Sequence, residues 1–296
     1  MGYYLQIYFQ FGEFLNQGGT LLLDLLVATA GAFLGVWGAW QIYLIQVRRE
    51  RNDILKYTAM LINSVIEKIH RQAKNCDAFA RQNIGNSTNV KLLPIIINSD
   101  LTRLVDKVDQ QKIFHAFRRR YNRSQLSLTT FRNIYNNLDY TYEVLNQIRE
   151  YYPNEQESLV EKKKRYFQFL EKAEEMMAIA TLDNHLPTPL KDFFGKTIQE
   201  FIEAKERSAF VENIGLGISI LVDPVIEFLM NGYRSEPASI EITTTLRNAG
   251  VTMNLIKQQS DALAESFREY AEKLETVNEK LKADAKELLN DFTVAG

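Results

Sequence analysis

The chain has 296 residues, and its 35 Lys and Arg nearly balance its 37 Asp and Glu, which leaves a formal net charge of −2. A near-neutral chain lacks the global basic field that attracts nucleic acid. The mean hydropathy of −0.24 fits one membrane segment on a polar body and argues against a multi-span transporter. The single cysteine, Cys76, excludes an internal disulfide and agrees with a reducing, cytoplasmic location.

Few helix breakers interrupt the chain, because it contains only 14 Gly and 6 Pro. We therefore predict an all-α protein, in which a single N-terminal transmembrane helix continues into a stalk and is followed by a multi-helix cytoplasmic bundle with a long C-terminal amphipathic helix. The predicted divisions are an extracytoplasmic or interfacial aromatic segment (1–19), the transmembrane helix (20–46), the stalk helix (47–84), a helical cytoplasmic domain (95–235), and a C-terminal extended segment with a long helix (236–296).

The segment 25–45, which reads LLVATAGAFLGVWGAWQIYLI, contains no charged side chain. About 20 such residues in a helix cross the ~30 Å hydrocarbon core of a bilayer. Trp37 and Trp40 lie near its C-terminal end, as in an aromatic belt at a membrane interface. The apolar run ends at three basic residues, Arg48, Arg49 and Arg51. The pattern favours an uncleaved anchor over a buried core helix or a signal peptide, because the first 47 residues contain no Lys or Arg.

The charges around the anchor also predict its direction. Glu13 and Asp24 are the charged side chains that precede it, whereas six basic residues follow: Arg48, Arg49, Arg51, Lys56, Lys68 and Arg71. The positive-inside rule then predicts an inner (cytoplasmic) membrane protein with its N-terminus outside and its C-terminal body in the cytoplasm. The aromatic residues of segment 1–19 either lie in the headgroup layer or lengthen the anchor.

Two features of the anchor go beyond its hydrophobicity. Gly31, Gly35 and Ala39 repeat every four residues, and small residues at this spacing let two helices approach closely, so they predict a homo-oligomer. Asp24 is costly within the hydrocarbon, where it would face a partner, water or a pore. At the outer interface it costs little, and this is the placement that we favour.

Amphipathic helices account for most of the body. In the stalk, apolar residues from Ile54 to Ile69 recur at helical spacing, and the stretch 81–94 ends the helix with Gly, Asn and Pro. The predicted helices that follow are one capped by Ser99 or Asp100, one from Ser124 to a stop at Pro153, one over 156–183 and one over 190–206.

Three further segments leave alternatives open. The apolar stretch 210–230 predicts a buried helix kinked near Pro224, with insertion into the membrane as the alternative. Residues 235–246 are rich in β-branched side chains and predict a short strand or an extended loop. From about Val251, apolar residues spaced by seven predict a long helix, which either packs on its own domain or forms a coiled coil between subunits.

Residue types that carry catalysis or bind metals form no recognisable pattern. His70, His115 and His185 lie far apart, without Cys or carboxylate partners at metal-ligand spacing. The chain has neither a phosphate-binding glycine loop nor a nucleophile elbow. No histidine follows an arginine at the spacing of HEPN-type ribonucleases. We therefore expect no catalytic residue, no metal and no cofactor.

Two basic runs predict either an anion-binding surface or a solvated helix face. The run Lys162–Arg165 lies among acidic residues, which favours the solvated face. In the other run Phe117 and Tyr121 are interleaved, so its side chains have the chemistry to bind RNA phosphates and stack on a base, or to bind anionic lipid. This second run consists of Arg118, Arg119, Arg120 and Arg123. The nearby His115 is expected at the edge of the core.

The layout resembles single-pass bacterial membrane proteins, including some anti-phage membrane effectors, in architecture alone. The leading hypothesis is a non-enzymatic anchored protein that self-associates through the anchor and stalk, binds a cytoplasmic protein or signal, and perturbs the membrane on assembly, as a pore or defence effector. One alternative is a passive membrane scaffold for a cytoplasmic partner. The other is an RNA-binding or RNA-cleaving protein that uses the arginine run. Membrane lipid is an expected partner, and nucleic acid is not favoured.

Overall fold

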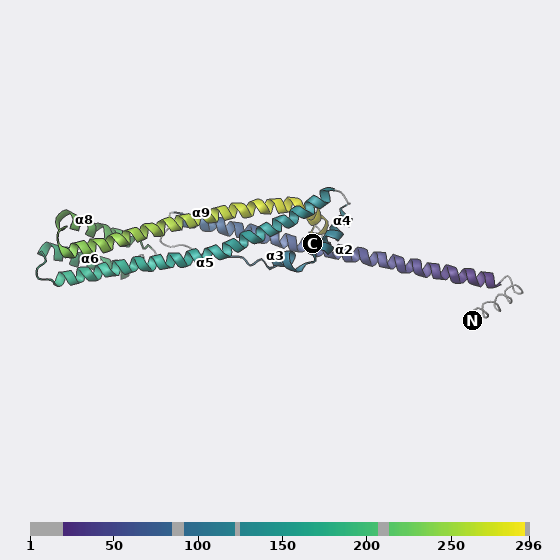
Figure 1. The fold of residues 1–296 in the computed structure, drawn as a ribbon, viewed down its shortest axis with the longest axis horizontal. Helices are drawn as coiled ribbons and strands as arrows, with labels where there is room; N and C mark the ends of the chain where they lie inside the picture. The colour runs from purple at the N-terminus through teal and green to yellow at the C-terminus, as the bar shows by residue number, and fades with distance from the viewer. Residues whose placement is uncertain (1–19, 85–91, 122–124, 207–212, 294–296) are drawn as a thin grey trace, which may run out of the picture.

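The structure is a computed structural model, and it describes residues 20–84, 92–121, 125–206 and 213–293. Every regular element in these ranges is helical, which confirms the predicted all-α class. Three helices are much longer than the others: α2 (Thr20–Asn83), α5 (Gln125–Leu182) and α9 (Pro237–Thr293). They lie side by side in a long bundle, from which the first half of α2 protrudes (Figure 1). The aromatic segment 1–19 lies outside the described residues.

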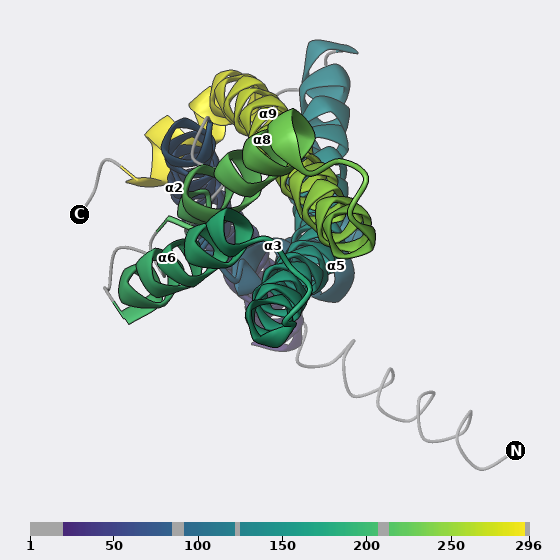
Figure 2. The ribbon, with the colours of Figure 1, turned by 90° about the vertical axis from the view of Figure 1, so that its left-hand side faces the viewer.

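The bundle is built on the antiparallel pair α5 and α9, which have 58 and 57 residues and are each about 86 Å long. The second half of α2 packs along the half of this pair that contains the end of α9; its contacts are chiefly with α9, and Phe79 also meets Tyr152 of α5. The other half is covered by α6 (Thr188–Glu206), a π-helical turn η2 (Ile218–Val222) and α8 (Asp223–Gly232), as Figures 1 and 2 show. The end from which α2 protrudes is called the proximal end, and the end with α6 and α8 the distal end.

The second half of α2 and the whole of α9 share one core. Leu55, Ile62 and Ile69 of α2 are buried, and α9 packs along this part of α2. Of the eight heptad positions predicted in the C-terminal helix, Tyr270 is half-buried and the others are buried: Ile256, Leu263, Phe267, Leu274, Val277, Leu281 and Leu288. The apolar seam of α9 is therefore filled by its own chain. Most of the predicted stalk is likewise part of the bundle.

An aromatic cluster joins the three long helices where α2 ends. Phe79 of α2 meets Tyr152 of α5 and Phe267 of α9 edge-to-face, with ring centroids 5.7 and 4.9 Å apart. Tyr152 and Phe267 also pack edge-to-face at 5.8 Å. The Tyr152 hydroxyl accepts a hydrogen bond from the backbone N–H of Leu93 at 2.9 Å. Each such ring pair adds about 0.5–1.5 kcal/mol beyond the area that it buries.

The prediction that a helix stops at Pro153 is wrong. The two helices expected on either side of it are one helix, α5, which runs through the proline. Proline removes a backbone donor from a helix and crowds the carbonyl four residues earlier. Here Tyr152, just before it, is held in the aromatic cluster, and Leu159 is buried after it. Packing on both sides offsets the local cost.

The prediction of a strand or extended loop over 235–246 is also wrong. Helix α9 begins at Pro237, and proline suits the first turn of a helix because its fixed φ is already helical. Ile242, Leu246 and Ala249 are buried at helical spacing. Packing against the distal core therefore overrides the β propensity of the threonines in this segment.

The described part of the apolar stretch 210–230 is packed inside the body; residues 210–212 lie outside the described ranges. Leu221, Val225 and Leu229 are buried, and the Tyr166 hydroxyl donates to the backbone oxygen of Ile214 at 3.0 Å. Pro224 lies in the first turn of α8, directly after η2, rather than inside one kinked helix. The described part of this stretch is therefore buried, as the first of the two predictions had it, rather than inserted into the membrane.

Short helices close the proximal end: α3 (Ser99–Thr102), a π-helical turn η1 (Arg103–Lys107) and α4 (Gln110–Arg120). Asn98 caps α3 by accepting a hydrogen bond from the Leu101 N–H at 3.2 Å. The cap therefore lies one residue before the predicted Ser99 and two residues before the predicted Asp100.

Asp100 has a different role, because it ties α3 to α2. Its carboxylate accepts hydrogen bonds from Lys68 Nζ at 2.6 Å and from Ser64 Oγ at 2.7 Å. The bond from Lys68, followed by that from Ser64, holds the pKa of the Asp100 carboxyl below its ordinary value of 3.8.

Gly217 is expected not to tolerate a side chain. A Cβ there would lie 2.5 Å from Tyr166 Oη and 2.6 Å from Leu170 Cδ1, and both of these side chains are buried. We expect Gly217→Ala to lower the free energy of unfolding by roughly 1–3 kcal/mol, as overpacking of a core does. Chemical denaturation of the full chain in detergent, followed by circular dichroism, measures the change.

The matched control is Gly195→Ala, at an exposed position of α6 where a Cβ would meet nothing within 4 Å. Replacing glycine in a helix at such a site is expected to be neutral or stabilising by about 0.5–1 kcal/mol. Equal stability of the two variants would contradict the close packing around Gly217.

Candidate membrane anchor and proximal surface

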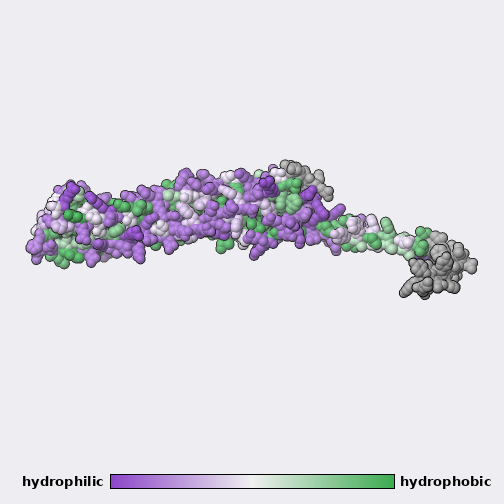
Figure 3. All heavy atoms as spheres, viewed as in Figure 1, coloured by the Kyte–Doolittle hydropathy of each residue, from purple (hydrophilic) through white to green (hydrophobic). Residues whose placement is uncertain are grey.

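The protruding half of α2 is the part of the described chain that is long and apolar enough to cross a membrane. None of its most apolar window is buried against the rest of the chain, and Phe33 and Val36 are each 72% exposed. Figure 3 shows this segment as a pale to green extension of a body that is mostly hydrophilic. A core helix of a soluble protein would have its apolar surface covered, so the exposure of this segment favours the bilayer as its surroundings.

The small residues of the anchor lie on one side of α2, together with Asp24. Gly31 and Gly35 follow Asp24 by seven and eleven residues, so each lies within about 20° of it around the helix axis. Ala39 borders the same side. A Cβ at Gly31 or Gly35 would meet nothing within 4 Å, so this side is open to a neighbouring helix.

The large aromatic residues lie on the opposite side. Phe33 and Trp40 are within about 20° of the direction opposite to Asp24, and Trp37 is within about 40° of it. The Trp40 ring is paired with that of Tyr43, with centroids 5.9 Å apart. The anchor therefore has one flat side and one bulky side.

The structure separates the predicted arginine run. Arg118 and Arg119 are exposed on α4. Arg120 instead forms an ion pair with Asp291 near the end of α9, at 3.3 Å, and its guanidinium lies 5.8 Å from the Phe292 ring centre. Arg123 lies outside the described residues. Among the described arginines of this run, Arg118 and Arg119 are thus exposed and form no ion pair within the described ranges.

The proposed stacking role of Phe117 and Tyr121 is not supported, because these rings pack internally. Phe117 is buried, with its ring centroid 4.7 Å from that of Tyr121 and 5.7 Å from that of Phe131 on α5. The Tyr121 hydroxyl donates to Asp291 at 3.0 Å. His115, expected at the core edge, is exposed. The aromatic residues of α4 hold it on the bundle and leave its basic residues outside.

Helix α4 connects α2 to the end of α9 at the proximal end of the bundle. Its beginning lies beside α2, where Lys112 lines one groove with Glu50, Ile54 and Tyr57. Its last residue, Arg120, reaches Asp291 of α9. Figure 1 shows α4 close to the point where α2 leaves the bundle.

Basic residues from three elements therefore meet near the exit of the anchor. Arg51 is half-buried and donates from Nε to the Val47 carbonyl at 3.1 Å, whereas Arg48 and Arg49 are exposed. Lys107 of η1 lines the same groove as Lys112. The exposed set, called here the proximal basic surface, consists of Arg48, Arg49, Lys107, Lys112, Arg118 and Arg119.

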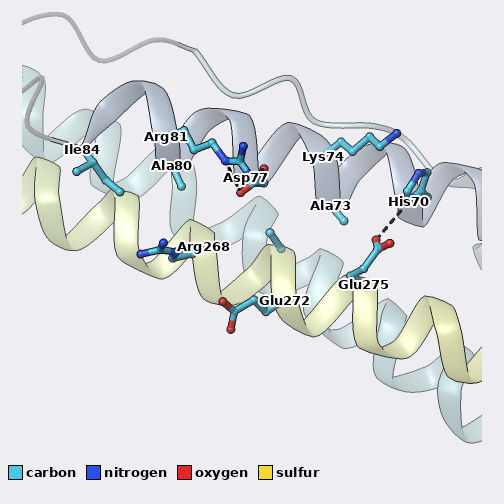
Figure 4. A pocket seen from close by; sticks show the side chains of 11 residues that line it. His70, Ala73, Lys74, Asp77, Ala80, Arg81, Ile84, Arg268, Glu272 and Glu275 are labelled. Atoms are coloured by element: carbon cyan, nitrogen blue, oxygen red, sulfur yellow. Dashed lines mark hydrogen bonds and ion pairs between the residues drawn. The ribbon is translucent and has the colours of Figure 1, made fainter.

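A second surface, a groove of about 530 Å³, lies between α2 and α9 midway along the body (Figure 4). Within it, Arg81 pairs with Asp77 at 2.9 Å, and His70 Nδ1 lies 3.2 Å from Glu275 Oε2. Within the described ranges, no group of three His, Cys, Asp or Glu side chains is placed to hold a metal ion. Its lining mixes alanines and Ile84 with equal numbers of basic and acidic side chains, so the groove has no surplus of one charge to select a ligand.

Comparison with known protein families, with curated proteins and with solved structures finds no match for this chain.

The two tryptophans of the chain, Trp37 and Trp40, both lie in the anchor and give it a direct optical test. We expect the full chain in vesicles to emit blue-shifted tryptophan fluorescence that lipids brominated on the acyl chain quench, with bromines near the interface quenching more than bromines at the bilayer centre. Trp37→Phe and Trp40→Phe separate the two signals. Unquenched emission typical of tryptophan in water would contradict membrane insertion.

Proposed function

We propose that the chain is a non-enzymatic, membrane-anchored protein that self-associates through the Asp24–Gly31–Gly35 side of α2 and carries a rigid helical body in the cytoplasm. The body binds a cytoplasmic protein or signal, and assembly of the anchors perturbs the membrane. The observation that carries the proposal is the two-sided, fully exposed apolar half of α2, which continues without a break into the packed bundle.

The flat side of the anchor supports self-association. In a bilayer, helices associate by close packing and interhelical hydrogen bonds, because lipid tails are as apolar as leucine. Glycine at 31 and 35 permits this approach, and the bulky aromatic side is left to lipid. Asp24 lies on the same side of the helix, at the end proposed for the outer interface, and so outside the close contact that the glycines permit.

The length of the body supports a scaffold as the second candidate function. The α5–α9 pair extends about 86 Å, so the distal end is held far from the membrane. Apolar side chains are exposed towards that end, among them Ile179 and Leu182, which are 62% and 81% exposed. A long helical body with exposed apolar side chains at its distal end suits a protein that holds a soluble partner at a fixed distance from the bilayer.

Self-association is expected to depend on the flat side alone. Gly31→Leu/Gly35→Leu puts two bulky side chains where helices would touch, and should abolish energy transfer between donor- and acceptor-labelled copies in vesicles. Asp24→Ala removes a like charge from each copy near the contact, so it should keep or slightly increase the energy transfer. The control, Phe33→Leu/Trp37→Leu on the opposite side, should associate normally. Equal loss from both double variants would rule out a specific face.

Membrane perturbation separates the two candidate functions. Vesicles that hold a potassium diffusion potential and a voltage-sensitive dye are expected to depolarise with the wild-type chain and to keep their potential with Gly31→Leu/Gly35→Leu. A wild-type chain that self-associates yet leaves the potential intact would favour the scaffold.

A further inference from the structure

We propose that the proximal basic surface binds the headgroups of anionic phospholipids in the leaflet from which α2 emerges. The inference rests on the proposed anchoring, and it adds a second, chemically specific contact between the body and the bilayer. The six residues come from α2, η1 and α4, and the fold gathers them around the exit of the anchor.

The distances match a headgroup layer. Taking Ile45 as the edge of the hydrocarbon, Glu50 lies about 8 Å and Tyr57 about 18 Å beyond it along the helix. Lys107 and Lys112 line the groove at this level. The headgroup region adds about 5–8 Å on each side of the hydrocarbon, and the Debye length at physiological salt is about 8 Å. The basic side chains thus either contact the lipid phosphates or lie about one Debye length from them.

The charges of this surface are also free to bind. Within the described part of the chain, no ion pair joins any of its six residues to a carboxylate. Neighbouring arginines differ, since Arg103 pairs with Asp100 at 3.4 Å and Arg120 with Asp291 at 3.3 Å. The acids nearby are partly committed as well, because Asp109 caps α4 through the N–H groups of Gln111 and Lys112.

Positive charge exceeds negative charge at this end. The exposed acids near the surface, with no ion pair in the described ranges, are Glu50, Asp53, Asp106, Asp109 and Glu287, against the six bases and the neighbouring exposed Lys56. Each Lys or Arg near an anionic membrane contributes a factor of about five to binding. Several bases together therefore select anionic over neutral lipid.

Lipid fits this surface better than RNA. Single-stranded RNA is held by basic residues together with exposed aromatic rings on which bases stack. The rings beside Arg118 and Arg119 are packed against α5 or bonded to Asp291. Because the anchor holds this charged surface next to a bilayer, the effective concentration of lipid phosphate around it is high.

The test places a donor dye on α4 of the full chain through His115→Cys. The native Cys76 is buried, and burial raises its pKa to about 11, so the introduced thiol takes the label at neutral pH. The protein is reconstituted in vesicles of phosphatidylcholine and phosphatidylglycerol that carry a trace of headgroup-labelled acceptor, either anionic or neutral. We expect more energy transfer to the anionic tracer than to the neutral one, and loss of this excess at high salt.

Arg118→Gln/Arg119→Gln should reduce the excess to less than roughly half, because two of the six bases are removed. Transfer to the neutral tracer should not change, since the anchor is intact. The matched control, Lys164→Gln/Lys172→Gln, removes the same charge from exposed positions in the distal half of α5 and should keep the full excess.

Three outcomes would overturn the inference. Equal transfer to both tracers with the wild-type chain would mean that the body is anchored but does not select anionic lipid. No transfer to either tracer would remove the anchoring on which the inference rests. Binding of a labelled single-stranded RNA to the vesicles that is lost in Arg118→Gln/Arg119→Gln, without an anionic excess, would assign the surface to nucleic acid.

Discussion

A mismatch of lengths governs this fold. Helices α5 and α9 form a pair about 86 Å long, while the part of α2 packed on them, from Leu55 to Asn83, is about 43 Å long. The distal half of the pair would expose its apolar face unless other residues covered it, and α6, η2 and α8 do so. The aromatic cluster of Phe79, Tyr152 and Phe267 marks the change from one cover to the other. One buried cluster extends across the predicted divisions at 84, 95 and 236, with residues from α2, α5, α6, α8 and α9.

The helical class and the long apolar stripes could be predicted from the sequence because a period of 3.6 residues is visible over many turns. The errors fall where packing outweighs local preference. Pro153 and the β-branched residues at 235–246 both carry strong local signals against helix, and both lie in helices whose apolar sides are buried. The seam of α9 was visible, but a seam does not indicate which helices fill it. That depends on where α2 and α5 return along the chain.

The proximal surface was predictable only in pieces. Arg48 and Arg49 stand out after the anchor, and Arg118 and Arg119 stand out in a basic run. Nothing in the sequence relates these pairs, and Lys107 and Lys112 carry no signal of their own. Folding of α4 against α2 brings them to one end of the body. For Phe117 the signal in the sequence is clear but misleading. Its position among arginines indicates stacking on a base, whereas in the structure its ring packs against α5 and attaches α4 to it.

The unbroken course of α2 also fixes how two bodies would be arranged around a shared axis. Leu55, which packs on the pair, lies twenty residues after Gly35 and so on roughly the opposite side of the helix, whereas the exposed Tyr57 and Met60 lie within about 40° of the Gly35 direction. With the proposed association through the glycines, the side of each α2 that carries Tyr57 and Met60 faces the axis between the two copies. Each α5–α9 rod then stands on the outer side of that axis. In that arrangement the anchor sets the azimuth of each body around the axis.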